Sequence, residues 1–304
     1  MSGLVTAVLS KPARIGAVAG ATLTQLVRMK LFLVPAAFAV LVLALQFIPY
    51  QDGIGIEFQG VAQLELLKDV ALGCMQVFGL VFSIAATALL IPRDTEDRIL
   101  YTILCKPVPR FDYLAGKLLG VWGLIILMVL FMDGMMCLLV QLREAGIAAD
   151  LTAALSQRGY GAEEMAPYLD AVHAAGNDWN TQMGIVAMLL GFGVLTGITL
   201  LISCFTSGSI VSIIFALGAY IIGMFQGSLF SIIFNGQGVT RLMQQVETAF
   251  AVIIPNFSIF SVSDAAAAGS PLGLELLGSL ALIAGGYMLL HLLIAAWLFQ
   301  HKEF

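Results

Sequence analysis

The charged side chains of this 304-residue chain gather in one stretch, where their chemistry would be ion pairing and docking. Of its 33 charged residues (14 basic and 19 acidic), nine lie between positions 93 and 117. They are Arg93, Asp94, Glu96, Asp97, Arg98, Lys106, Arg110, Asp112 and Lys117. Acids and bases set so closely can pair with one another or with a complementary surface. The stretch is therefore the first candidate for a binding site.

Within this stretch the sequence predicts a short helix. Asp94 is a suitable N-cap, the acids that follow place negative charge in the first turn, and Pro107 ends the helix. Apolar residues recur at helical spacing and form one face: Ile99, Leu100, Ile103 and Leu104. We expect this face and the mixed charges beside it to contact a partner. The alternative is a solvated loop whose basic residues only set the topology.

The sequence has no residue pattern typical of a catalytic, cofactor-binding or metal-binding site. The three histidines, His173, His291 and His301, are isolated from one another. The cysteines at positions 74, 105, 137 and 204 have no pairing or metal-ligand spacing. No G-x-x-x-x-G-K-[ST] phosphate loop occurs in the sequence. We therefore expect a chain that is not itself an enzyme and binds no cofactor or metal of its own.

The composition predicts a membrane protein. Hydrophobic residues make up 60% of the chain, charged residues only 11%, and the mean hydropathy is +0.98. Ordinary globular proteins have about 25% charged residues, and about 20 apolar residues cross a bilayer as a helix. The expected fold is all-α and polytopic, a single transmembrane domain. Its six expected spans are 31–51, 70–92, 118–142, 183–204, 209–234 and 276–300.

Two breaks delimit these spans. Pro92 is expected to end the second span, because proline interrupts a helix interior. The polar run Ser203–Ser209 is expected to separate the fourth span from the fifth.

The distribution of lysine and arginine orients the spans. With both termini in the cytoplasm, the inner side has Lys11, Arg14, Arg28, Lys30, Arg93, Arg98, Lys106, Arg110, Lys117 and Lys302, against Lys68, Arg143, Arg158 and Arg241 outside. The loop 93–117 is then cytoplasmic, and the acidic loop 143–182 is an external helical cap broken at Gly159-Tyr160-Gly161. Because the basic residues are divided between the two sides of the membrane, they do not form one basic face, and we expect no nucleic-acid binding.

Two further segments have a predicted relation to the bilayer. Residues 14–30 have apolar residues at three- and four-residue steps and basic residues at their end, which predicts an amphipathic helix on the inner leaflet. An ordinary cytoplasmic tail is the alternative. Residues 248–263 are uncharged but short for a crossing, and Pro255-Asn256 interrupts them. We expect an external re-entrant segment at 235–275 rather than a seventh span.

Asp133 is the only acid inside a predicted span. A carboxylate at the bilayer centre costs about 2.5–3.5 kcal/mol on insertion scales, so its side chain should face protein or water. It is either a polar point on a substrate path or subunit interface, or an acid satisfied by a neighbouring helix.

The loop also resembles a known family. Its sequence DRILYTILCKPVPRFDYLAGKLLG is similar to the segment after the second span of type-2 ABC exporter permeases, E-x-x-x-G-T-L-x-x-L-L-S-x-P-V-x-R-x-x-x-L-x-G-K-L-L-G. Pro107-Val108, Arg110 and Gly116-Lys117 match directly, whereas Arg98-Ile99 replaces Gly-Thr and Cys105 replaces Ser. TLTQLVRMKLFL resembles the elbow helix of these proteins, and IIPNFSIFSVSDAAAAGSPLG their outer segment before the last span. The resemblance is strongest to the permeases grouped with copper-enzyme maturation and sodium export.

The resemblance implies a mechanism and partners. Residues 93–117 would hold a coupling helix inserted into a separate ATPase subunit, which would bind ATP and Mg²⁺. Two permease copies or paralogues would complete an exporter of unknown substrate in the bacterial inner membrane. The residues implied in coupling are Arg93, Asp94, Glu96, Asp97, Arg98, Leu100, Leu104, Pro107, Arg110 and Lys117. An ion-coupled secondary transporter and a non-transporting assembly factor are the alternatives.

Overall fold

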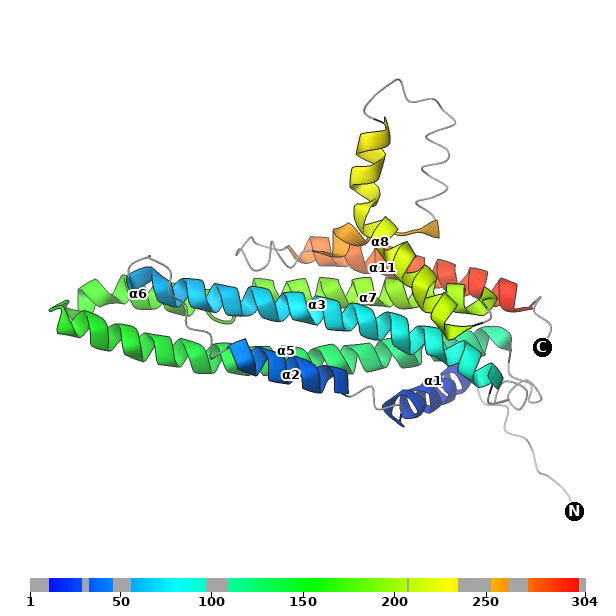
Figure 1. The fold of residues 1–304 in the computed structure, drawn as a ribbon, viewed down its shortest axis with the longest axis horizontal. Coiled ribbons are helices and arrows are strands. Elements are labelled where there is room, and N and C mark those ends of the chain that lie inside the picture. The colour runs from blue at the N-terminus through cyan, green and yellow to red at the C-terminus, as the bar shows by residue number, and fades with distance from the viewer. Residues whose placement is uncertain are drawn as a thin grey trace, which may run out of the picture.

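The computed structural model describes residues 11–28, 33–45, 56–96, 109–206, 208–234, 253–261 and 273–300. In these ranges all the regular structure is helical. The elements are α1 (Lys11–Arg28), α2 (Leu33–Leu45), α3 (Ile56–Glu96), α5 (Arg110–Gln157), α6 (Ala162–Ala175), α7 (Trp179–Phe205), α8 (Ser209–Phe234), the 3₁₀ turn η1 (Phe257–Phe260) and α11 (Leu274–Gln300). Helices α3, α5, α7 and α11 run along the long axis of the molecule (Figure 1).

Five segments of the described chain are long and apolar enough to cross a membrane. They are Gly60–Asp94, Arg110–Gln157, Ala162–Phe205, Ser209–Gln226 and Leu274–Gln300. The chain is therefore an all-helical, multi-pass membrane protein, as the composition predicts. The first predicted span, 31–51, lies partly outside the described residues, and its described part is the apolar helix α2. Six spans remain a prediction.

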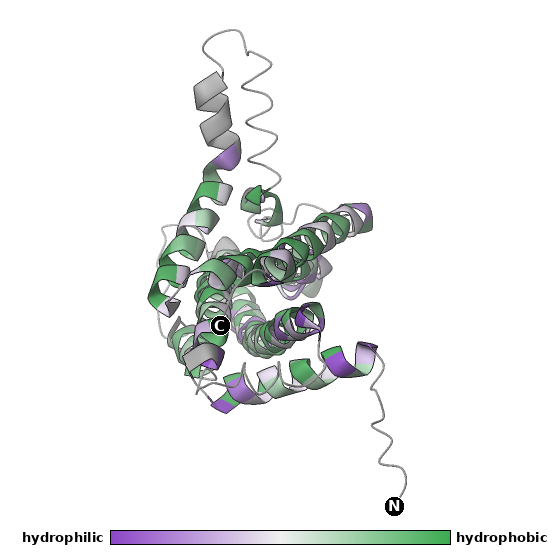
Figure 2. Ribbon diagram, turned by 90° about the vertical axis from the view of Figure 1, so that its right-hand side faces the viewer, coloured by the Kyte–Doolittle hydropathy of each residue, from purple (hydrophilic) through white to green (hydrophobic). Residues whose placement is uncertain are grey.

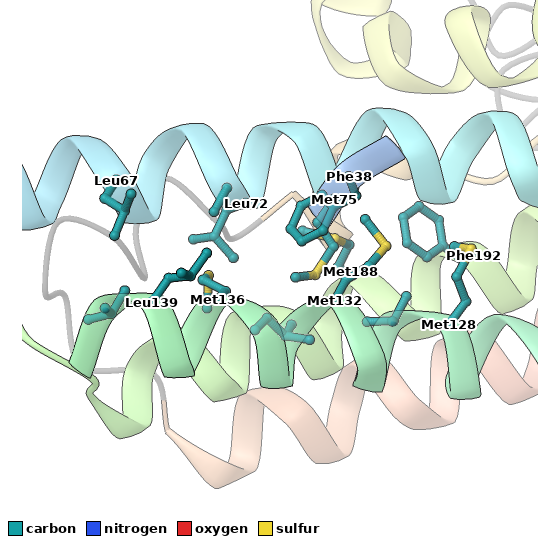
Figure 3. Packing of buried hydrophobic residues seen from close by; sticks show 14 of the residues in the cluster. Phe38, Leu67, Leu72, Met75, Met128, Met132, Met136, Leu139, Met188 and Phe192 are labelled. Carbon is teal, nitrogen blue, oxygen red and sulfur yellow. The ribbon is translucent and has the colours of Figure 1, made fainter. Parts of the chain in front are cut away.

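Methionine-rich packing holds the middle of the bundle together. Side chains of α3, α5 and α7 meet there with Phe38 of α2 (Figure 3). The cluster includes Met75, Met128, Met132, Met136, Met188 and Phe192, each no more than 3% exposed. Methionine has three rotatable bonds and a polarisable sulfur, so it fills irregular gaps between long helices.

Two of the helices are much longer than a bilayer is thick. Helix α5 has 48 residues and α3 has 41. At about 1.5 Å per residue α5 is roughly 70 Å long, against about 30 Å of hydrocarbon. Beyond Gln157 the chain turns through Gly159, whose φ of 86° suits glycine, and returns as α6. This turn lies where the sequence predicts the break.

The expectation that Pro92 ends its helix is wrong, because α3 continues through it to Glu96. Proline has no N–H, so Pro92 leaves the carbonyl of Ala88 without its helical donor. The Ser203 hydroxyl of α7 donates to that carbonyl at 3.5 Å, and both residues are fully buried. A neighbouring serine is a common way to satisfy a carbonyl freed by proline in a membrane helix. Helix α7 ends at Phe205 and α8 begins at Ser209, where the sequence predicts a break.

Helix α1 lies across the end of the bundle instead of along it (Figure 2). It meets α5 at two glycines one turn apart. A Cβ on Gly116 would lie 3.0 Å from the Ile15 carbonyl oxygen, and one on Gly120 would lie 2.8 Å from that of Ala19. Small residues four apart let helix backbones approach this closely in membranes. The two glycines therefore set the position of α1.

Replacing Gly120 with alanine should loosen this contact. The new methyl group would meet backbone, which cannot rotate away, and overpacking of this kind costs about 1–3 kcal/mol. Gly123→Ala is the matched control in the same helix, since its Cβ would meet no atom within 4 Å. Thermal unfolding of the purified protein in detergent should show a lower Tm for Gly120→Ala. The control should keep or raise the Tm, because alanine favours a helix over glycine by about 1 kcal/mol. Equal shifts in both variants would contradict the close contact.

Candidate functional site

A buried polar cluster joins three helices at the end of the bundle where α3 stops and α5 starts. We call Gln25, Asp94, Tyr113 and Lys117 the Asp94 cluster. Asp94 is in the last turn of α3, and Tyr113 and Lys117 are four residues apart on one face of α5. Gln25 comes from α1. Asp94, Tyr113 and Lys117 are all at most 4% exposed.

The carboxylate of Asp94 is the centre of this cluster. Lys117 Nζ lies 2.7 Å from its Oδ2, and the Tyr113 hydroxyl donates to the same oxygen at 2.5 Å. Gln25 Nε2 donates to Oδ1 at 3.1 Å. Lys117 Nζ in turn donates to Gln25 Oε1 at 3.0 Å. Each oxygen of the carboxylate therefore has a donor, and the donors come from two different helices.

Because the cluster is buried, it is stable only with short distances and complete hydrogen bonding. Desolvating each ion costs several kcal/mol, which a pair offsets only when it is close and fully hydrogen-bonded. Moving α5 away from α3 would leave a buried charge without its partner, and moving α1 away would leave Asp94 Oδ1 without its donor. The cluster therefore favours one relative placement of the three helices more strongly than apolar packing alone would.

Two further contacts bind neighbouring helices to the first turns of α5. Arg14 of α1 pairs with the buried Asp112, at 2.8 Å from Nη2 and 2.9 Å from Nε. Arg110 donates to the Phe299 and Gln300 carbonyls at the end of α11, the second at 2.8 Å. Its guanidinium also lies 5.9 Å from the Phe299 ring centroid.

Aromatic stacking links α11 to the Asp94 cluster itself. The rings of Tyr113 and Phe299 are stacked, with centroids 6.1 Å apart and planes 21° apart. Lys117 Nζ lies 5.7 Å from the Tyr113 ring centroid on α5. A cation near an aromatic face contributes about 0.5–2 kcal/mol, more where water is excluded. Four helices, α1, α3, α5 and α11, are thus joined at this end of the bundle.

The predicted coupling residues divide into four groups. Asp94, Arg110 and Lys117 take part in these contacts, and Arg93 is exposed. Glu96 lies in α3, but its side chain is outside the description. The others, together with most of the predicted coupling helix, lie outside the described residues: Asp97, Arg98, Leu100, Leu104 and Pro107.

The expectation that Asp94 caps a helix in the loop is wrong. Asp94 is the third-last residue of α3, and its carboxylate points to Tyr113 and Lys117. The capping prediction fails because α3 does not stop at Pro92. Sequence reasoning also missed Gln25, Tyr113 and Arg14 as partners. The available signal was the spacing Tyr113-x-x-x-Lys117, which sets two polar groups on one face of an otherwise apolar helix.

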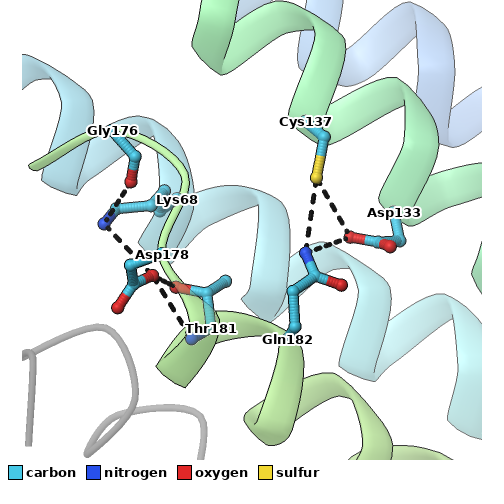
Figure 4. Close-up of polar contacts among 7 residues, drawn as sticks. All are labelled: Lys68, Asp133, Cys137, Gly176, Asp178, Thr181 and Gln182. Atoms are coloured by element: carbon cyan, nitrogen blue, oxygen red, sulfur yellow. Dashed lines mark hydrogen bonds and ion pairs between the residues drawn. The ribbon is translucent and has the colours of Figure 1, made fainter. Parts of the chain in front are cut away.

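Asp133 is paired with a neighbouring helix. Gln182 Nε2 of α7 donates to Asp133 Oδ1 at 3.0 Å, and Cys137 Sγ lies 3.4 Å from the same oxygen (Figure 4). The side chain is half-buried. These contacts agree with an acid satisfied by another helix, one of the two interpretations that the sequence left open.

A second group of polar contacts lies farther along the bundle, toward α6. Lys68 of α3 is 4% exposed and donates to the Gly176 carbonyl at 3.2 Å (Figure 4). Its Nζ is also 3.9 Å from Asp178. Asp178 in turn caps α7 by accepting from the Thr181 N–H at 3.3 Å.

Among the described residues no group of three or more potential metal ligands occurs.

Breaking the Asp94–Lys117 pair on one side should destabilise the protein strongly. Lys117→Met leaves a buried carboxylate without its cation, which costs about 3–5 kcal/mol for a buried pair. Asp94→Asn combined with Lys117→Met removes both charges and should recover part of the loss. Denaturant unfolding in detergent measures Lys117→Met, Asp94→Asn and the double variant, with Lys11→Met on the exposed start of α1 as control. A double variant as unstable as the sum of the two single ones would contradict a direct pair.

The chain can be placed in a family by comparison with known proteins. The sequence model for ABC-2 family transporter proteins matches residues 17–304. No curated protein is similar enough to match. The matched range includes three of the four helices joined at the Asp94 cluster in full and most of α1. It covers nearly the whole sequence. The chain therefore belongs to the ABC-2 transporter family and is a membrane permease of an ABC transporter.

Proposed function

We propose that this permease couples ATP hydrolysis by a separate ATPase subunit to the export of a substrate, and that the Asp94 cluster transmits the movement. The observation that carries the proposal is the place of the cluster. Asp94 lies two residues before Glu96, where α3 ends, and Lys117 lies seven residues after Arg110, where α5 begins. Residues 97–109, which belong to the predicted coupling loop 93–117, connect these two helix ends. A force applied to that segment acts first on the two helix ends that Asp94 and Lys117 hold together.

A rigid junction at this point would let the loop move helices as a unit. The Asp94 carboxylate binds α5 and α1 at once, and Arg110 binds the end of α11. Packed interfaces respond to small displacements by rigid-body shifts, because a close-packed core does not deform continuously. A displacement of the loop would thus reach α1, α3, α5 and α11 together. Asp94 and Lys117 would act from inside the bundle, while exposed residues such as Arg93 would meet the partner.

Helix α1 is proposed as the elbow helix at the inner membrane surface. It lies across the bundle end (Figure 2). Thr22 and Leu26 are buried, and Lys11 and Arg28 are exposed. Basic side chains at a membrane surface can reach the headgroups while an apolar face stays buried. The end of α11 lies at the same end of the bundle as α1 (Figure 1). This supports α1 and the end of α11 on one side of the membrane, which we propose is the cytoplasmic side of a bacterial inner membrane.

The segment before α11 supports a re-entrant path. Ile253 accepts a hydrogen bond from His291 Nε2 at 3.0 Å, and His291 lies nine residues before the end of α11. The Pro255 carbonyl fits against Gly223 of α8, and Phe260 against Gly191 of α7. The segment thus packs among three helices, well inside their ends.

A second permease copy or paralogue would complete the exporter, with ATP and Mg²⁺ on the ATPase.

Separate variants should distinguish docking from transmission. Glu96→Lys combined with Arg98→Glu reverses charges in the predicted coupling loop 93–117 and should abolish co-purification of the ATPase subunit. Asp94→Asn combined with Lys117→Met should leave the ATPase bound but reduce the effect of the permease on ATP hydrolysis in proteoliposomes at least about tenfold. Glu163→Lys with Arg158→Glu, in the loop at the other end of the bundle, is the charge-matched control. It should change neither quantity.

Two results would contradict the proposal. Full co-purification by the Glu96→Lys, Arg98→Glu variant would remove the docking role of the loop. Unchanged stimulation of ATP hydrolysis in the Asp94→Asn, Lys117→Met variant would remove the cluster from the transmission path.

A further inference from the structure

An apolar groove lies on the side of the bundle, where α1, α2, α3 and α5 meet. Its volume is about 480 Å³, within the range of about 300–1,000 Å³ common for ligand sites. Its walls include Leu26, Pro35, Phe82, Leu124, Leu127 and Phe131. Every residue that lines it is apolar. The groove therefore offers no hydrogen-bond partner to a polar ligand, and it suits a hydrocarbon.

The groove has a buried floor and an exposed rim. Leu26 and Phe82 are at most 2% exposed, whereas Val27, Leu127 and Phe131 are 52%, 65% and 55% exposed. The exposed rim belongs to α5, to the end of α1 and to Ala36 of α2. On a membrane helix, exposed large apolar side chains face lipid. The groove is thus open to the bilayer, which is full of acyl chains.

Most of the groove lies within the depth of one leaflet. Leu124 and Leu127 lie 6 and 9 residues beyond Leu118, where the third span is expected to begin. At about 1.5 Å per residue these positions are roughly 9 and 14 Å into the membrane, within the inner half of about 30 Å of hydrocarbon. Phe131, at roughly 20 Å, lies just past the midplane. An acyl chain that started at the headgroups beside α1 would reach Leu124 and Leu127.

Charge at the mouth of the groove favours an anionic headgroup. The exposed Arg28 follows Val27, a rim residue, and ends α1. Residues 11–30 have no acidic residue, and besides Arg14, which pairs with Asp112, they include the basic residues Lys11, Arg28 and Lys30. Basic residues beside a membrane attract anionic lipids, and each changes the affinity about fivefold.

We propose that this groove binds one acyl chain of an anionic phospholipid from the inner leaflet, with the lipid phosphate beside Arg28. Bound there, the lipid would fill the space between α1 and α2 and hold α1 in its place across α5. The site depends on the membrane location of the chain and not on its coupling to an ATPase.

Native mass spectrometry of the full-length protein in detergent tests the proposal. The probes are palmitoyl-oleoyl phosphatidylglycerol and palmitoyl-oleoyl phosphatidylcholine. Ala36→Phe fills the groove, and Ala37→Phe places the same side chain on a neighbouring exposed residue outside its lining. Arg28→Gln removes the charge at the mouth. Lys11→Gln makes the same change at the far end of α1, about 25 Å away.

We expect one phosphatidylglycerol to remain bound to the wild type and to the Ala37→Phe and Lys11→Gln variants. Ala36→Phe should lose both lipids, and Arg28→Gln should lose about fivefold in preference for phosphatidylglycerol over phosphatidylcholine. Equal lipid retention by Ala36→Phe and Ala37→Phe would overturn the proposal. So would a change from two copies to one in Ala36→Phe without lipid loss, which would show that the groove binds a second chain.

Discussion

The buried carboxylate of Asp94 is the constraint on which the arrangement of this permease depends. In a low-dielectric interior an ion is tolerated only while its partners stay in place. Those partners come from α1 and α5, whereas Asp94 itself ends α3. Apolar helices in a bilayer have no hydrophobic driving force to associate, because lipid tails are as apolar as their side chains, so close packing and polar contacts hold them together. Polar groups that must meet therefore decide which helices associate and in which register.

The rest of the bundle is consistent with this arrangement. Gly116 and Gly120 allow α1 to come close enough for Gln25 to reach Asp94. Ser203 satisfies the carbonyl freed by Pro92, so α3 can extend to the turn that places Asp94 opposite Lys117. The methionine-rich middle adapts to whatever helix spacing these contacts set. Polar contacts thus lie toward both ends of the long helices, with adaptable packing between them.

The sequence predicts the class of the fold well, because hydropathy alone decides which segments can cross a membrane. It also predicts the turn at Gly159 and the break between α7 and α8, where local chemistry interrupts the helix. It fails at Pro92, since a serine more than a hundred residues away satisfies the freed carbonyl. The same limit applies to the candidate site. Asp94 and Lys117 stand out by charge, but nothing local shows that they bind each other inside the bundle or that Gln25 joins them. These contacts depend on tertiary approach, which one sequence does not reveal.

The rigidity of the junction can be measured directly by electron paramagnetic resonance distance measurements in the reconstituted transporter. One spin label is placed at the exposed Thr24 of α1 and the other at the exposed Leu119 of α5. We expect one narrow distance distribution, with the same mean in the absence and in the presence of ATP, because the Asp94 cluster moves α1 and α5 together. A mean distance that changes with ATP, or a broad distribution in both states, would contradict the rigid junction.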